Sequence, residues 1–306
     1  MLYEYAVEPE AVGSDWQTCR YLIEKFGFDR GRLISQFPKQ WLRMVYEASA
    51  HLQPIDRARV TEILNRSKPN IVRFGREYDG TLDWTGNAIG QQAKEPFHAI
   101  IAKENPKALS FVVRAEDVDE GHPLMVAPHN WEVPRVGASL AQAMAPLLKT
   151  AQTIRFVDKY FKFDDPRYKE TLRAALALIS GFGRSDIRCE IHFADHATCW
   201  PIREIEIRVG QWLRGVIPVG MSVVLFDWKE KSGGEDFHDR FLLTDRGGMT
   251  IGAGFSADGP HQNAQIGLLD PSVWSTKMKA LDRSATVYEL ADCVLEVHSD
   301  GRVERI

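Results

Sequence analysis

The chain has 306 residues, of which 44% are hydrophobic and 26% are charged. These proportions are typical of a globular protein and exclude a disordered or fibrous chain. With 38 Lys and Arg residues against 42 Asp and Glu residues, the net charge is −4. This balance excludes a polycation that binds nucleic acid by bulk charge, although it leaves room for a local basic site.

Nothing in the sequence indicates export or membrane insertion. The first ten residues, MLYEYAVEPE, lack the basic and apolar regions of a secretory signal. The apolar runs at 174–179 and 223–226 are far shorter than the ~18 residues that a membrane span requires. The four cysteines are scattered along the chain, as is typical of free thiols in a reducing compartment. We therefore expect a cytoplasmic protein that does not bind a membrane.

The N-terminal half carries short, mixed patterns. Helical periodicity occurs at 41–48 and 55–65, whereas 98–103 and 110–114 have the texture of strands. Three prolines in the stretch PLMVAPHNWEVPRVG, which ends at Gly137, indicate a boundary just after it. We expect an α+β N-terminal domain over residues 1–138, and its sequence assigns it no role.

Residues 139–306 alternate between strand patterns and amphipathic helices. Apolar stripes predict helices at 140–151, 165–179 and 202–216, and Pro146 is expected to kink or divide the first of them. The predicted strands are 154–160, 187–193, 222–228, 237–244, 249–255, 285–290 and 293–298. This order predicts an α/β domain in which a mixed β-sheet is flanked by helices.

One stretch, FHDRFLLTD followed by IGAGFS, carries the strongest functional signal. On a strand, His238 and Arg240 would project from the same face, where an imidazole and a guanidinium could act together on a phosphate. Asp245, at the end of that strand, could orient a partner group. Gly252 and Gly254 on the next strand would allow a ligand to approach the backbone closely.

The spacing of His238, Arg240, Asp245 and Gly252 resembles the motif of the phospholipase D superfamily, in which a histidine and a lysine precede an aspartate and a Gly-Ser pair. Asp158 is similar to the aspartate that closes the first strand in this superfamily. The His-Asp-Arg sequence followed by Gly-x-Gly is similar, more narrowly, to the phospholipase-D-like C-terminal domain of MIT-domain proteins. The resemblance covers residues 139–306.

The resemblance implies a metal-independent phosphodiesterase, most plausibly a nuclease, that forms a phosphohistidine intermediate and needs no cofactor. His238, Arg240 and Asp245 would be catalytic, and Asp158, Gly252, Gly254 and Ser256 would bind the substrate. Two copies of the motif are required and this chain has one, so the resemblance implies a homodimer. The expected partners are nucleic acid or another phosphodiester ligand and, by analogy with anti-phage and restriction systems, other subunits of a bacterial defence system.

The motif departs from the superfamily pattern in ways that leave an alternative open. Arg240 replaces the usual lysine, Ala253 and Ser256 replace a serine and an asparagine, and Glu235 and Asp236 lie directly upstream. The relatives with His-Asp-Arg bind rather than hydrolyse. The alternative is therefore a catalytically inactive domain that binds a phosphate-bearing ligand, and a structural adaptor with a vestigial pocket is a third reading.

Several residues also have purely structural readings. His238 and Arg240 could be solvated strand residues, and Asp245 followed by Arg246-Gly247-Gly248 also suits a hairpin turn. The spacing of His192, His196 and Cys199 is compatible with zinc ligation. The sequence offers no evident fourth ligand, so we predict no metal site.

Overall fold

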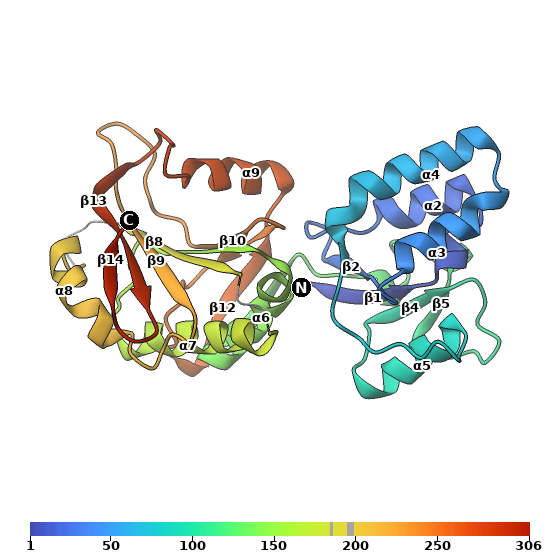
Figure 1. The fold of residues 1–306 in the computed structure, drawn as a ribbon, viewed down its shortest axis with the longest axis horizontal. Coiled ribbons are helices and arrows are strands. Elements are labelled where there is room, and N and C mark those ends of the chain that lie inside the picture. The colour runs from blue at the N-terminus through green and yellow to red at the C-terminus, as the bar shows by residue number, and fades with distance from the viewer. Residues whose placement is uncertain (184–185, 195–198) are drawn as a thin grey trace. The chain divides into compact units, whose positions relative to one another are not determined.

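The structure is a computed structural model that describes residues 1–183, 186–194 and 199–306. The chain divides into an N-terminal unit (Met1–His129) and a C-terminal unit (Asn130–Ile306) (Figure 1). The expected boundary followed residue 138. The strand β6 (Asn130–Arg135), which precedes that point, pairs with a strand of the C-terminal unit.

The N-terminal unit is built on a five-stranded sheet in the order β3-β2-β1-β4-β5, in which every pairing is parallel. The elements of this unit are β1 (Tyr3–Val7), α1 (Pro9–Val12), α2 (Trp16–Glu24), β2 (Arg32–Ser35), α3 (Trp41–Ala48), α4 (Pro54–Ser67), β3 (Ile71–Val72), α5 (Trp84–Lys94), β4 (Ala99–Ala102) and β5 (Val112–Arg114). The expectation of an α+β domain is therefore wrong for this unit, which is a parallel α/β sandwich.

The sequence did not predict a parallel α/β unit because the sheet is buried on both faces. The four residues of β2 and the four of β4 are all buried, so these strands lack the alternation that marks a half-exposed strand. Helices α2, α3 and α4 cover one face and α5 covers the other (Figure 1). Asp15 caps α2 by accepting a hydrogen bond from the Thr18 N–H, and Asp83 caps α5 in the same way from Gly86.

The C-terminal unit has a mixed sheet in the order β14-β13-β9-β8-β7-β10-β11-β12-β6 within the described residues. Its further elements are α6 (Gly137–Thr150), β7 (Thr153–Val157), α7 (Pro166–Gly181), β8 (Arg188–Ala194), α8 (Ile202–Trp212), β9 (Ser222–Lys229), β10 (Phe241–Thr244), β11 (Gly248–Ile251), β12 (Gly259–Leu268), α9 (Pro271–Ala280), β13 (Glu289–His298) and β14 (Val303–Arg305). Strands β7, β8 and β9 run parallel, and the neighbours on both sides of this trio are antiparallel to it. The α/β class predicted from the sequence is confirmed.

Helices cover both faces of this sheet. Helix α9 lies on one face, over an apolar cluster that includes Phe226, Phe241 and Leu281, and α6 and α7 lie on the other (Figure 1). Helix α6 runs through Pro146 without dividing, contrary to one of the two expected outcomes. Helix α7 begins where the sequence predicts, because Asp165 accepts a hydrogen bond from the Arg167 N–H at 2.9 Å.

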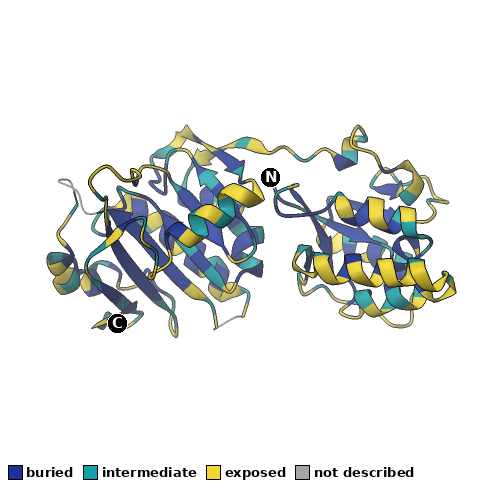
Figure 2. Ribbon diagram, turned by 90° about the horizontal axis from the view of Figure 1, so that it is seen from above, coloured by how far each residue is buried: buried dark blue, intermediate teal, exposed yellow. Residues whose placement is uncertain are grey.

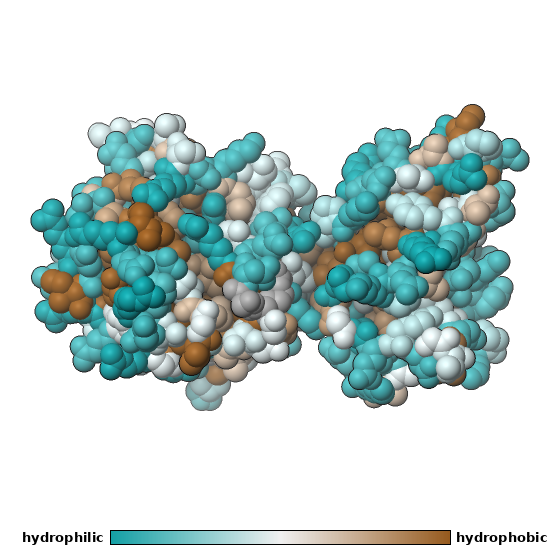
Figure 3. Space-filling view, in the orientation of Figure 1, coloured by the Kyte–Doolittle hydropathy of each residue, from teal (hydrophilic) through white to brown (hydrophobic). Residues whose placement is uncertain are grey.

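The pattern of burial follows this layering. The strands of both sheets are mostly buried, and the outer surfaces of the helices are exposed (Figure 2). On the face shown in Figure 3, hydrophobic side chains occur in small groups among hydrophilic ones in each unit. Within the described residues, no helix is long and apolar enough to cross a membrane.

Candidate phosphate-binding site

Asp158 directly follows β7, at the carboxyl end of the parallel trio of strands. Its side chain is fully buried, and its two carboxylate oxygens accept hydrogen bonds from the backbone N–H groups of Tyr160 (3.0 Å) and Phe255 (3.1 Å). Burial raises the pKa of the Asp158 carboxyl, while the two N–H donors and Arg240 act in the opposite direction. The carboxylate thus joins the loop after β7 to the turn after β11.

Arg240 completes this arrangement from the segment before β10. Its Nε atom lies 3.6 Å from Asp158 Oδ1, and its Nη1 donates a hydrogen bond to the Gly252 carbonyl oxygen at 3.1 Å. Its guanidinium lies 5.5 Å from the ring centroid of Tyr160. The Arg240 side chain remains 27% exposed, and no described residue accepts a hydrogen bond from Nη2. The guanidinium is therefore positioned by Asp158 and Gly252 while the side chain stays partly exposed.

Gly254 permits this close packing. Its φ angle is +70°, and a Cβ atom at this position would lie 2.2 Å from Asp158 Oδ2 and 2.8 Å from Arg240 Cδ. The sequence placed Gly252 and Gly254 on a strand, but β11 ends at Ile251 and both glycines lie in the turn that follows. The two glycines do bring the backbone close to Arg240 and Asp158, but they do so from a turn and not from a strand.

His238 does not occupy the predicted strand face. Strand β10 begins at Phe241, which pairs with Val157, the last residue of β7, so within the described residues the pairing with β7 does not extend to His238. His238 is exposed and makes no hydrogen bond or ion pair with any described residue. It lines a cavity of about 10 Å³ with Phe241 and Lys277, too small for a phosphate group. The prediction that His238 and Arg240 share a strand face is therefore wrong.

Asp245 lies at the opposite end of β10 from Arg240. Its Oδ1 atom accepts hydrogen bonds from the backbone N–H groups of Gln152 (2.7 Å) and Thr153 (3.1 Å), at the start of β7. The structure does not bring Asp245 near Asp158 or Arg240, because the length of β10 separates them. Its contacts are those of a residue that fixes the start of a strand.

Ser256 belongs to a neighbouring group of charged residues. The buried Ser256 donates a hydrogen bond through Oγ to Asp258 at 3.0 Å, and its carbonyl oxygen accepts one from Arg135 Nε at 3.3 Å. Asp258 also forms ion pairs with Arg135 and Arg167. No sequence signal pointed to Arg135, because it comes from β6 and reaches this turn only through the β6–β12 pairing.

The candidate zinc ligands were His192, His196 and Cys199, and the contacts of His192 are not those of a metal ligand. His192 is fully buried, with Nδ1 3.0 Å from the Trp228 indole N–H and Nε2 3.1 Å from Glu190 Oε2. Both ring nitrogens are therefore engaged within the protein. His196 lies outside the described residues. The four cysteines, Cys199 among them, are free thiols.

Comparisons with known proteins identify no family for this chain. No protein-family model matches it, and no curated protein matches it. Among solved structures, it is similar to TrmBL2, described as an archaeal chromatin protein with a novel mode of DNA binding. That similarity has a TM-score of 0.26 at 11% identity, and it covers 79% of this chain and 66% of the other. A similarity of this size does not establish a shared fold.

Proposed function

We propose that the C-terminal unit is a phospholipase-D-like module that binds a phosphodiester group, of nucleic acid in the first instance, through Arg240. The observation that carries this proposal is the partly exposed Arg240 guanidinium, which contacts with Asp158 and Gly252 hold in place. A guanidinium presents paired N–H groups that match two oxygens of a phosphate. The Arg240 side chain is 27% exposed, whereas the Asp158 carboxylate is fully buried, so an anion that approaches from solvent meets the guanidinium before the carboxylate.

The geometry favours binding over hydrolysis within one chain. A catalytic histidine is normally oriented by a second group that fixes its tautomer and direction. No described residue forms a hydrogen bond with His238, so nothing in the described part of the chain holds its imidazole toward a phosphorus atom. Of the two readings that the resemblance leaves open, the non-catalytic one fits this arrangement better.

Metal-independent hydrolysis by a homodimer is the second candidate. It is favoured by the exposure of His238, because a nucleophile that must meet its counterpart from a second copy has to be accessible. In this candidate, His238 of each copy would contribute one of the two histidines that the superfamily mechanism requires. A role in anti-phage defence stays a prediction from the sequence resemblance.

One experiment separates the candidates. Fluorescently labelled single-stranded and double-stranded DNA and RNA are titrated with the full chain in EDTA, and anisotropy reports binding while gel electrophoresis reports cleavage. We expect binding without cleavage, and Arg240→Ala should weaken binding about tenfold. Arg203→Ala, an exposed arginine of α8 that pairs with Asp292, serves as the matched control and should bind normally.

Three results would change the conclusion. Equal binding by wild type and Arg240→Ala would refute the role of Arg240. Cleavage in EDTA that is lost in His238→Ala would establish the second candidate instead. Cleavage that persists in His238→Ala would exclude His238 as the nucleophile.

A further inference from the structure

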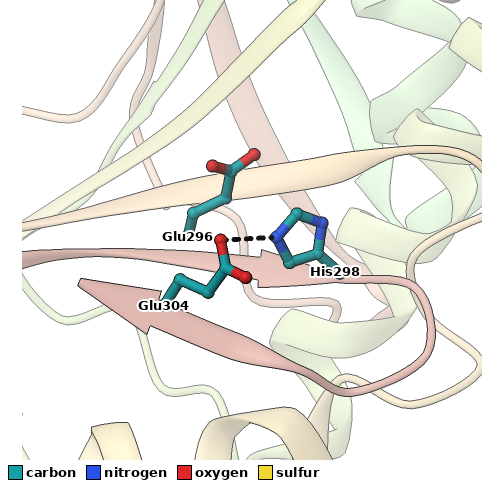
Figure 4. A group of neighbouring side chains, drawn as sticks. All are labelled: Glu296, His298 and Glu304. Carbon is teal, nitrogen blue, oxygen red and sulfur yellow. Dashed lines mark ion pairs between the residues drawn. The ribbon is translucent and has the colours of Figure 1, made fainter. Parts of the chain in front are cut away.

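A second group of polar side chains lies on the hairpin of β13 and β14. Glu296 and Glu304 are directly opposite each other in the antiparallel pairing, and His298 follows Glu296 by two residues, so it lies on the same face. Their candidate ligand atoms, one from each side chain, all lie within 4.8 Å of one another. The imidazole and the Glu304 carboxylate point toward each other, with Glu296 beside them (Figure 4).

Each carboxylate has one oxygen held by a neighbouring donor. Ser222 donates a hydrogen bond through Oγ to Glu296 Oε1 at 2.6 Å, and Arg302 pairs with Glu304 Oε1. The second Glu304 oxygen, Oε2, faces His298 Nε2. Outer contacts of this kind orient carboxylates that ligate metal ions.

His298 Nε2 is the feature that points to a ligand. This nitrogen is shielded from solvent and has no hydrogen-bond partner among the described residues. Its distance to Glu304 Oε2, 3.6 Å, is too long for a hydrogen bond. A shielded polar atom without a partner costs free energy, as do two carboxylates that face each other across strands. A divalent cation between the three side chains would relieve both costs.

The hairpin is fixed from its other face, which favours a preorganised site. Gly301, in the turn between β13 and β14, packs against Gly210 of α8 so closely that a Cβ on Gly210 would lie 2.0 Å from the Gly301 carbonyl oxygen. Arg305 of β14 also forms an ion pair with Glu206 of α8. These contacts hold β14 in register, and therefore hold Glu304 opposite Glu296.

We propose that Glu296, His298 and Glu304 bind a divalent transition-metal ion, most suitably Zn²⁺, with one coordination position left for water. An imidazole with two carboxylates suits zinc better than magnesium or calcium, which prefer oxygen ligands alone. Tetrahedral zinc ligands lie ~3.3 Å apart, so the side chains need to close by no more than ~1.5 Å from their present spacing.

The site is separate from the proposed phosphate-binding site. Ser222 begins β9, whereas Asp158 follows the end of β7. Because β7, β8 and β9 run parallel, the two sites lie at opposite ends of these strands. The role that follows is to clamp β14 to β13 through ligands on both strands of the hairpin, and it does not depend on phosphate binding. The proposal therefore stands or fails independently of the proposed function.

The test is zinc binding by the full chain. EDTA-treated, dialysed protein is titrated with ZnCl₂ by isothermal titration calorimetry, alongside His298→Ala, Glu304→Gln and the control His261→Ala, an exposed histidine of β12. We expect one zinc site that is weakened at least tenfold in His298→Ala and in Glu304→Gln and is retained in His261→Ala. Far-ultraviolet circular dichroism verifies that each variant is folded. Because Glu304 is exposed, we expect Glu304→Gln to fold normally.

A second measurement reports directly on the ligands around the metal ion. Co²⁺ substituted for zinc should give visible d–d absorption that Zn²⁺ displaces and that Glu304→Gln alters. The proposal is overturned if the wild-type chain binds no zinc, or if zinc binds the two site variants as tightly as it binds wild type.

Discussion

Arg240 Nε lies 3.6 Å from Asp158 Oδ1, and this pair links the segment before β10 to the loop after β7. The two residues are far apart in the sequence and become neighbours because β7 and β10 pair antiparallel, with Val157 opposite Phe241. The ion pair positions the guanidinium.

Asp158→Asn should release Arg240. An amide can accept through one oxygen only, so the substitution leaves one backbone N–H without a full acceptor and removes the charge beside the guanidinium. We expect the free energy of unfolding to fall by about 1–3 kcal/mol and phosphodiester binding to weaken. Urea denaturation and DNA anisotropy measure the two effects. Asp239→Asn, at an exposed neighbouring carboxylate, should change stability little, and an equal loss in both variants would contradict the role of Asp158.

Gly254→Ala should lower the free energy of unfolding more than Gly233→Ala, a substitution at a glycine with the same backbone conformation. Gly254 and Gly233 have almost the same φ, +70° and +71°, but a Cβ at Gly254 collides with Asp158 and Arg240, whereas a Cβ at Gly233 has nothing within 4 Å. Backbone strain alone costs ~1 kcal/mol, so Gly233→Ala should lose about that much and Gly254→Ala at least ~2 kcal/mol. Thermal and urea unfolding of the two variants give the comparison; equal losses would mean that close packing at Gly254 is unimportant.

The buried pair of Glu190 and His192 should make stability depend on pH. Burial lowers the pKa of His192, with Arg155 and Arg188 acting in the same direction and Glu190 opposing them. Because the unfolded imidazole binds a proton more readily than the folded one, stability is full above its ordinary pKa of 6.5 and falls as the pH drops below that value. His192→Gln should flatten the pH dependence between about pH 7.5 and 5.5, as measured by urea unfolding. His261→Gln is the control and should leave the slope unchanged.

Glu190 should add a second decline at lower pH. Hydrogen bonding from His192 and the charges of His192 and Arg155 lower the pKa of the Glu190 carboxyl from 4.5 to about 2, even though burial acts to raise it. The stabilisation from this carboxylate is present above pH 4.5 and is lost as the pH falls toward 2. Unfolding monitored by circular dichroism from pH 6 to 2 should show this loss in wild type and a weaker one in Glu190→Gln. A parallel decline in both would exclude Glu190 as its source.

Asp245→Ala should destabilise the chain without affecting the site. The substitution removes the acceptor for the N–H groups of Gln152 and Thr153 and should cost ~1–3 kcal/mol. Binding of labelled DNA by the protein that remains folded should be unchanged, because β10 separates Asp245 from Arg240. Loss of binding with unchanged stability would instead give Asp245 a place in the site.

The sequence by itself determined the elements with a clear period. The apolar stripe from Tyr168 to Ile179 and the run that begins at Ser222 predicted α7 and β9 well, because a half-buried helix and a bounded apolar run leave local patterns. Short strands such as β1 and β2 escaped prediction, since strands buried between two helical layers lack alternation.

Only the tertiary structure decided which residues meet. The sequence singled out Asp158, Arg240 and Gly254, but their contact depends on the pairing of β10 with β7 and on the positive φ of Gly254. The prediction for His238 was wrong because it extended the strand to residues that precede Phe241, and the pairing of β10 with β7 begins only at Phe241. The contact of His298 with Glu304 likewise arises from strand register. Local spacing fixes the direction of a side chain within one element, whereas register and turn conformation decide what that side chain faces.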